Sequence, residues 1–246
     1  MKSIVISQPM YFPWPGMLEQ VRHADTFVHY DDVPFSKGSF TNRVQVKTAS
    51  GRGWLTVPVS SKRTPIVHLV DVDRERWTRV HRETLEQALA GAPYLSDALM
   101  LFDVSVRGRS FCDIAIRSLE ALARYFDVMP RDGFVRSSTL NVPGASSQRV
   151  RDVVLTLGGT HYVTGHGAQH YLDHELLEEC GIETRYLDYA LTPYLQRFGP
   201  FTPYVTALTL VAHEGRAGAQ YLNSPTTHWK RFLHERLQPS THQDAA

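Results

Sequence analysis

Residues 1–43, MKSIVISQPMYFPWPGMLEQVRHADTFVHYDDVPFSKGSFTNR, decide the fold that we expect for this chain. A short β-branched run, Ile4-Val5-Ile6, leads into Pro9–Gly16, which holds three prolines, one glycine and three aromatic residues in eight positions. Because proline removes a hydrogen-bond donor and fixes φ, this loop is neither a helix nor a central strand. A helix over Met17–Ala24 and a strand over Thr26–Tyr30 follow. The pattern predicts a βαβ unit whose loop lies at the carboxyl end of its first strand, where open α/β sheets bind ligands.

Strand and helix patterns alternate over the rest of the chain, with long crossovers between the strands. This order predicts an α/β fold with a mainly parallel, Rossmann-like sheet and helices on both faces. We expect the main strands near residues 2–7, 26–31, 133–137, 160–164 and 182–187. We expect the helices over Arg74–Leu89, Leu95–Phe102, Phe111–Tyr125, Ser147–Leu157, Ala168–Cys180, Tyr204–Ala212 and Thr227–Leu237.

The organisation that we predict is a single α/β domain over residues 1–238, followed by a disordered polar tail over residues 239–246. An insertion of about residues 33–130 separates the second and third main strands. It begins with a β-hairpin, because the alternating runs Asn42–Lys47 and Trp54–Val59 flank a turn-rich stretch, and Ile66–Val70 predicts a further strand.

Composition excludes several classes of function. A formal net charge of +1, with no long block of either sign, gives no electrostatic argument for nucleic acid. No apolar run approaches the roughly 18 residues of a spanning helix, so we expect no membrane insertion. The first residues enter a strand pattern directly, without the apolar region of a signal peptide, and this predicts a cytoplasmic protein.

Five blocks of the sequence resemble the WbqC-like family, which occurs in bacterial O-antigen and natural-product gene clusters. They are QPMYFPWPGMLEQ (8–20), ADTFVHYDDVPFSKGSFTNRVQVK (24–47), WLTVP (54–58), YVTGHGAQHYLDHELLEECGIE (162–183) and YLQRFGPFTPYVTALTLVAHEG (194–215). The resemblance runs nearly end to end. It implies transfer of an acyl or aminoacyl group, such as glycyl, onto a sugar. Many relatives have His where this chain has Ser7, so a mechanism that needs that imidazole does not carry over.

The order of the first elements also has an analogy with the nucleotidylyltransferases of the HIGH superfamily. Their first loop carries an HxGH-type signature, and the corresponding stretch here is Phe12–Met17. It keeps the glycine but lacks both histidines that hold nucleotide phosphates. The sequence therefore leaves a HIGH-like fold open without supporting nucleotide chemistry.

Three residues are catalytic candidates: Asp31, Asp32 and His166. If the sheet is doubly wound, the first and fourth main strands are neighbours, and the Gln8–Gly16 loop faces Thr164–Gly167 across a crevice. Asp31 and Asp32 follow the second strand at its carboxyl end. One of them acts as a base or orients an amine, or it caps a turn; both interpretations stay open. His166 is an acid/base or anion-contacting residue at a loop tip.

We expect neither a metal nor a cofactor. His166, His170 and His174 have the i, i+4, i+8 spacing of one helical face, but the outer two lie about 12 Å apart in a helix. No cysteine or carboxylate is placed to complete a ligand set.

The remaining candidates are substrate-binding residues in loops at the carboxyl ends of the strands. The second proline–aromatic loop, Leu191–Pro203, forms a pocket wall beside the first loop or simply covers the core. Arg43 clamps an anion or is a solvated strand charge. Gly165 and Gly167 let backbone N–H groups approach a carboxylate or phosphate at a helix start. The full set is Ser7, Gln8, Tyr11, Trp14, Lys37, Asn42, Arg43, Thr164, Gly165, Gly167, Tyr194 and Gln196.

The sequence thus favours a transferase that moves an acyl or aminoacyl group onto an amino sugar or small amine by direct transfer. Its partners would be a small-molecule substrate and an acyl donor or carrier protein. Two alternatives stay open: a non-catalytic module that binds a ligand or a carrier protein, and a nucleotide-dependent transferase of HIGH-like fold.

Overall fold

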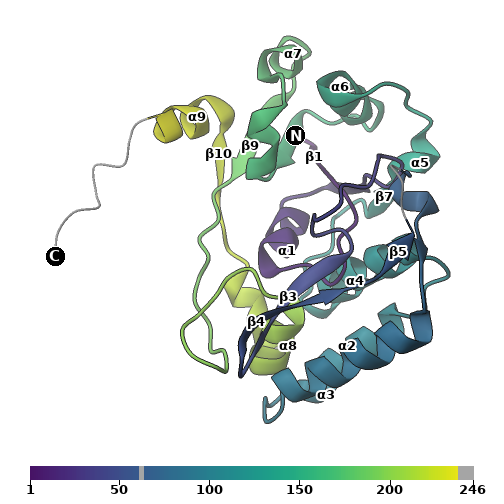
Figure 1. Ribbon diagram of the computed structural model, residues 1–246. Helices are drawn as coiled ribbons and strands as arrows, with labels where there is room; N and C mark the ends of the chain where they lie inside the picture. The colour runs from purple at the N-terminus through teal and green to yellow at the C-terminus, as the bar shows by residue number, and fades with distance from the viewer. Residues whose placement is uncertain (61–63, 238–246) are drawn as a thin grey trace.

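The computed structural model describes residues 1–60 and 64–237 and is built around a six-stranded sheet in the order β10-β9-β8-β1-β2-β7 (Figure 1). Five strands are parallel, and the edge strand β10 is antiparallel to β9. The strands are β1 (Ser3–Ser7), β2 (Thr26–His29), β7 (Phe134–Arg136), β8 (His161–Thr164), β9 (Glu183–Leu187) and β10 (Thr226–His228). All five predicted main strands are confirmed. The predicted tail lies outside the described residues.

Helices cover both faces of the sheet, because its side chains alternate between two apolar clusters. Val5 of β1 belongs to the cluster formed with α1 (Pro15–Arg22) and α4 (Phe111–Tyr125). Ile4 and Ile6 point to the other face and pack with α6 (Ser146–Thr156), α7 (His174–Glu179) and α9 (Trp229–Leu237). The predicted mainly parallel sheet between two helical layers is therefore confirmed.

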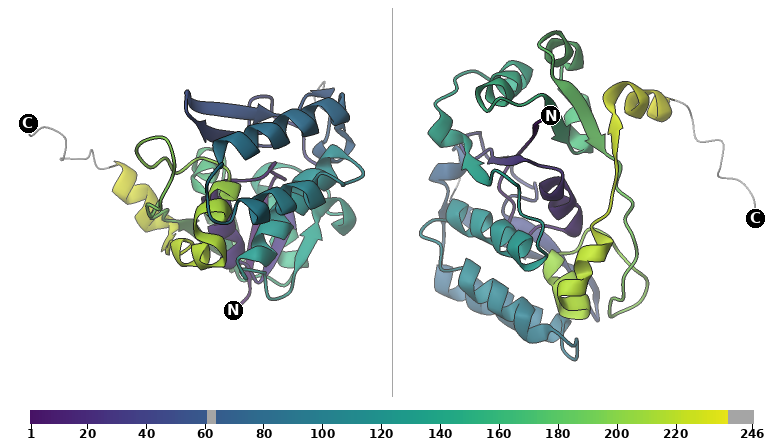
Figure 2. Two further views of the ribbon diagram at one scale, coloured as in Figure 1. Left: turned by 90° about the horizontal axis from the view of Figure 1, so that it is seen from below. Right: turned by 180° about the vertical axis from the view of Figure 1, so that it is seen from behind.

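Further helices extend the layer on the α4 side. α3 (Leu95–Ser105) packs between α4 and α2 (Arg74–Ala88), and it also contacts α8 (Ala207–Glu214). Figure 2 shows α2, α3 and α4 lying one beyond another outside the sheet. No helix within residues 1–60 and 64–237 is long and apolar enough to cross a membrane.

The segment between β2 and β7 contains the predicted hairpin, formed by β3 (Arg43–Thr48) and β4 (Gly51–Thr56). Val44 and Val46 of this hairpin are buried, and β3 lies beside α2 and the start of α8 (Figure 1). The predicted strand over Ile66–Val70 is wrong. Its residues form a 3₁₀ turn, η1 (Ile66–His68), and two short strands, β5 (Val59–Ser60) and β6 (Val70–Asp71), pair beside it.

Several helix boundaries differ from the prediction because side-chain caps set them. The predicted helix over Ala168–Cys180 is broken, since the Asp173 carboxylate accepts from the amide of Leu176 and starts α7 there. The preceding residues form only a 3₁₀ turn, η2 (His166–His170). Thr206 caps α8 in the same way, so this helix begins at Ala207, three residues after the predicted start at Tyr204. The short elements α5 (Ser137–Leu140) and η3 (Gly215–Tyr221) were not predicted.

The fold buries one titratable pair that connects the first loop to α2. The Tyr11 hydroxyl and His81 Nδ1 lie 2.9 Å apart, and both side chains are at most 5% exposed. Burial lowers the pKa of His81 from 6.5 to about 4, although a backbone hydrogen bond with Thr56 opposes the shift. His81 is therefore neutral in the folded protein at pH values where it is protonated in the unfolded chain.

Stability is expected to fall as the pH drops from about 6.5 to about 4, because the unfolded chain binds a proton at His81 that the folded protein excludes. A pKa shift of this size corresponds to a loss of about 3 kcal/mol in the free energy of unfolding. Urea unfolding across this range should show the loss in the wild-type protein, and a His81→Phe variant should lose less. If the free energy of unfolding fell equally with pH in the two proteins, the assignment to His81 would be contradicted.

Candidate functional site

The candidate site lies at the carboxyl edge of the sheet, where the strand order reverses. β1 pairs with β2 on one side and with β8 on the other, so the chain leaves this edge in opposite directions after β1 and β8. Open α/β sheets bind ligands at such a switch point. The predicted adjacency of the first and fourth main strands is confirmed.

The first proline–aromatic loop connects β1 to α1, and its aromatic side chains have different surroundings. Tyr11 and Phe12 are completely buried, so Tyr11 packs in the core and does not reach a ligand, contrary to the prediction. Trp14 is partly exposed and packs on Tyr189 and Tyr204, with ring centroids 4.9 and 5.4 Å away.

Gly16 follows two positions after Trp14, and the indole lies directly over it. A Cβ at Gly16 would come within 2.1 Å of the Trp14 ring, which explains why glycine is required there. Pro15 supplies no N–H, and the Met17 N–H donates to the Trp14 carbonyl. The start of α1 is therefore covered by Trp14, where HIGH-type enzymes hold phosphates.

The second proline–aromatic loop packs beside the first, as predicted. The Gln196 amide spans this loop, since it donates to the Thr202 carbonyl and accepts from the Thr202 N–H, each at 3.0 Å. Lys47 of β3 is 8% exposed and donates to the carbonyls of Gly199, at 2.8 Å, and Pro200. Gln196, predicted to bind substrate, is thus occupied in holding the loop together.

Between the two loops lies a small open pocket of about 20 Å³. Tyr194 forms part of its wall and is in ring contact with Phe201 and Tyr221. Glu19 of α1 also lines it, and the sequence analysis missed this residue. The complete lining is Trp14, Pro15, Gly16, Glu19, Leu191, Thr192, Tyr194, Phe201, Pro203 and Tyr221.

The two aspartates after β2 have different environments. Asp31 is fully buried, and its carboxylate accepts from the Ser138 N–H at 3.0 Å and from the Ser138 hydroxyl at 2.9 Å. It holds the start of α5, so the capping interpretation applies to Asp31, and its burial does not support the predicted catalytic role. Asp32 keeps 27% of its side chain exposed and stays accessible.

Asp32 is held by a hydroxyl and a guanidinium. Ser137 Oγ donates to Oδ1 and Arg149 Nη2 donates to Oδ2, both at 2.5 Å. Burial raises the pKa of Asp32, but these hydrogen bonds and the Arg149 charge outweigh it and hold the pKa below its ordinary value. Asp32 is therefore ionised at neutral pH.

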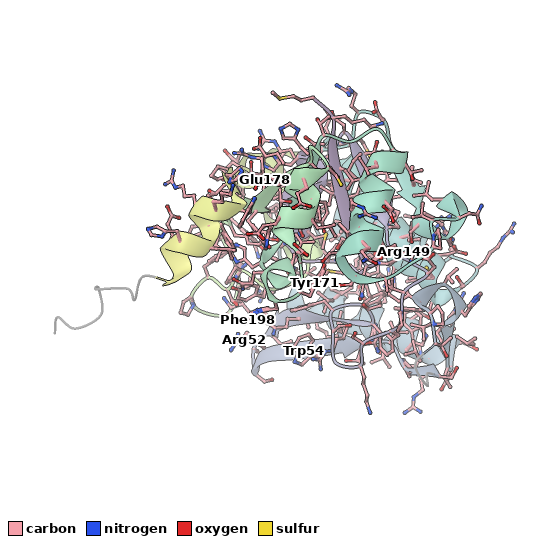
Figure 3. The ribbon with its side chains drawn as sticks, turned by 90° about the horizontal axis from the view of Figure 1, so that it is seen from above. Arg52, Trp54, Arg149, Tyr171, Glu178 and Phe198 are labelled. Atoms are coloured by element: carbon pink, nitrogen blue, oxygen red, sulfur yellow. The ribbon has the colours of Figure 1, made fainter. Side chains whose placement is uncertain are left out.

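Arg149 connects Asp32 to a group of hydroxyl-bearing side chains that the sequence analysis missed. Its guanidinium carbon lies 5.0 Å from the centre of the Tyr30 ring. Burial raises the pKa of Tyr30, Arg149 opposes the shift, and Asp32 and Tyr171 add to it. Figure 3 shows Arg149 and Tyr171 on the same side of the molecule, with Tyr171 exposed. The Tyr162 hydroxyl, buried beneath, donates to Thr164 Oγ1 at 3.3 Å. Thr164, a predicted binding residue, belongs to this group.

A topological signal identifies these missed residues. In a parallel sheet the crossover helices run back from the carboxyl edge, so their first turns lie beside the ligand site. Arg149 is the fourth residue of α6, and Glu19 is the fifth residue of α1. Charged side chains near the starts of crossover helices were the available sequence signal.

His166 lies after β8 as predicted, but its surroundings differ from a loop tip. Its Nε2 contacts the Leu187 carbonyl at 2.7 Å, and its ring packs between Tyr189 and Phe232. His174 has a different partner, the Tyr186 hydroxyl, and it lies in α7, whereas His166 lies in η2. The three histidines do not share a helical face, because η2 and α7 are separate.

The glycines after β8 also differ from the expected anion site. Gly165 precedes the short 3₁₀ turn η2 and Gly167 lies within it, so no regular helix dipole points at them. A Cβ at Gly165 would lie 2.8 Å from the Tyr189 hydroxyl and 2.9 Å from Gln20 Nε2, so the Tyr189 and Gln20 side chains pack directly against this glycine. Gly167 is exposed and has open space around it.

The other predicted binding residues lie around the hairpin entry. Ser7 ends β1, and Gln8 Oε1 accepts from the Thr41 hydroxyl at 3.5 Å. Asn42 is buried and donates to the Val57 carbonyl at 2.8 Å. Arg43 donates to the Gly38 carbonyl, and its guanidinium carbon lies 4.2 Å from the centre of the Trp54 ring. Lys37 is exposed in the adjoining loop.

Comparisons with known proteins agree with the extent of this site. A protein of Mycobacterium tuberculosis (strain ATCC 25618 / H37Rv), described as uncharacterized protein Rv1507c, is 27% identical over 228 residues, 90% of this chain and 98% of that protein. No solved structure matches the chain. The model of the WbqC-like protein family matches residues 8–221, which include both loops, Asp32, Arg149 and His166. The chain therefore belongs to the WbqC-like protein family.

Proposed function

We propose that this protein is a transferase that moves an acyl or aminoacyl group onto a small amine, such as an amino sugar. The observation that carries the proposal is the group formed by Asp32, Arg149, Tyr30 and Tyr171 at the carboxyl edge of the sheet. It combines one ionised carboxylate with several hydroxyls and aromatic rings. Hydroxyls and rings suit a sugar, and the carboxylate suits its amine.

In this proposal Asp32 positions the acceptor amine and receives its proton. The amine nitrogen forms a bond to the acyl carbon, and the bond between that carbon and the leaving group breaks. With a thioester donor, the leaving group is the thiolate. Arg149 keeps Asp32 ionised until the proton is transferred. Asp32 suits this role better than His166, whose Nε2 is engaged by a backbone carbonyl.

The proposal is tested by incubating the protein with glucosamine and an acyl thioester of N-acetylcysteamine, either acetyl or glycyl. Mass spectrometry should detect the corresponding amide above the uncatalysed background. Glucose, which has a hydroxyl in place of the amine, is the matched control and should give no transfer product. No product from any amino sugar and thioester pair in a panel of these compounds would overturn the proposal.

The pocket between the loops favours the second candidate, a non-catalytic module that binds a ligand or carrier protein. Its wall is mostly aromatic and apolar, which serves binding without acid–base chemistry. In a reconstituted pathway, a binding module would lose function with Trp14→Ala and keep it with Asp32→Asn. The opposite pattern supports the transferase. Nucleotide-dependent chemistry is the weakest of the three functions, since Trp14 covers the start of α1.

A further inference from the structure

The pocket between the loops has a composition that the transfer reaction does not require. Four aromatic side chains, Trp14, Tyr194, Phe201 and Tyr221, line it together with the carboxylate-bearing Glu19. None of the described lining residues is basic. Aromatic faces carry negative potential, so rings and a carboxylate together attract a positive charge.

Glu19 forms no ion pair in the described part of the chain. It is 4% exposed, and its Oε2 accepts from the Ser224 hydroxyl at 2.6 Å. The Arg22 guanidinium, one turn along α1, donates instead to the Leu222 carbonyl. Burial raises the pKa of Glu19, although hydrogen bonds from the Ser224 hydroxyl and from the backbone N–H groups of Ser224 and Asn223, together with the Arg22 charge, oppose the shift. A buried carboxylate without a counter-ion is stabilised when a cation binds beside it.

The aromatic wall is fixed before any ligand binds. Tyr194 is in edge contact with Phe201 at 5.4 Å, and Trp14 is fixed by its two tyrosine neighbours and by Gly16. The Tyr194 hydroxyl is buried, and the neighbouring Gln196 amide is held by Thr202. A rigid wall loses little conformational entropy on binding.

From these contacts we propose that the pocket is a binding site for an organic ammonium ion. A metal cation is disfavoured, because the wall offers one carboxylate where hard cations need about six oxygen ligands. An anion is disfavoured by Glu19 and by the absence of a basic lining residue. The site goes beyond the proposed transfer reaction, because its occupancy needs no acyl donor.

The test uses choline, tetramethylammonium and methylammonium with the full-length protein, in the absence of any acyl donor. Isothermal titration should detect binding of at least one of these cations. Dimethylbutanol, in which carbon replaces the nitrogen of choline, should bind at least about tenfold more weakly than choline if choline is the cation bound. Methanol is the corresponding neutral control for methylammonium.

Glu19→Gln keeps an oxygen that accepts from Ser224 and removes the charge, so it should weaken cation binding about tenfold or more. Tyr221→Leu should do the same by removing one ring. Trp54→Leu, which removes an exposed indole from the hairpin, is the control and should bind as the wild type does. The proposal is overturned if no cation binds, if the neutral isostere binds equally well, or if both pocket variants bind normally. Transfer activity is measured separately, so either proposal can fail alone.

Discussion

Replacing Asp32 by Asn is expected to lower the rate of amide formation by about 10²- to 10⁴-fold, the range for loss of a positioned acid or base. The substitution keeps the shape of the side chain and its contact with Ser137 but removes the charge that receives the proton. The measurement is turnover with the amine and thioester pair that gives product in the panel described above. A rate within threefold of wild type would exclude Asp32 from the chemistry.

Two further variants separate this effect from a loss of folding. Asp152→Asn is the matched control, because Asp152 also pairs with an arginine of α6, at 2.8 Å, but on the surface. It should leave the rate unchanged. Asp32→Glu keeps the carboxylate and should retain more activity than Asp32→Asn. Circular dichroism of each variant should confirm that Arg149, left without its carboxylate partner in Asp32→Asn, does not unfold the protein.

Truncating Phe12 to Ala is expected to lower the free energy of unfolding by about 3–5 kcal/mol, the usual cost of removing a buried phenylalanine ring. Phe12 is 1% exposed and stacks on Phe102 with a centroid separation of 5.2 Å. Its N–H donates to the Ser118 hydroxyl at 3.0 Å. The ring thus joins the first loop to α3, and the backbone bond joins it to α4. Urea unfolding measures the loss.

Leu195→Ala in the second loop is the control for this substitution. Leu195 is 73% exposed, so its truncation should change the free energy of unfolding by less than about 0.5 kcal/mol. If Phe12→Ala were as stable as Leu195→Ala, the first loop would not be part of the core.

The candidate site was predictable wherever it follows from the order of the strands. The alternation of strand and helix patterns predicted the five parallel strands, and a doubly wound order placed β1 beside β8, so the carboxyl-edge loops were found. The order of the strands did not predict which single residues within those loops are accessible. Tyr11 and Trp14 look equivalent in a proline–aromatic loop, yet one is fully buried and the other lines a pocket.

The same division separates Asp31 from Asp32. Both follow β2, but Ser138, more than 100 residues away, occupies one carboxylate, while Arg149 holds the other in its ionised form. Neither partner is visible from the sequence around the aspartates. The broken helix after β8 has a similar cause, since Ser147 of α6 accepts from the Asp173 N–H at 2.8 Å and fixes the turn before α7.

The sequence by itself determined the parallel sheet, its two helical layers, the hairpin and the edge at which the candidate site lies. These follow from hydrophobic periodicity and proline positions, which act within a few residues. Only the tertiary structure decided which side chains are accessible there. It joined Arg149 to Asp32 and placed Glu19 among aromatic rings from both loops, because such contacts depend on how distant segments pack together.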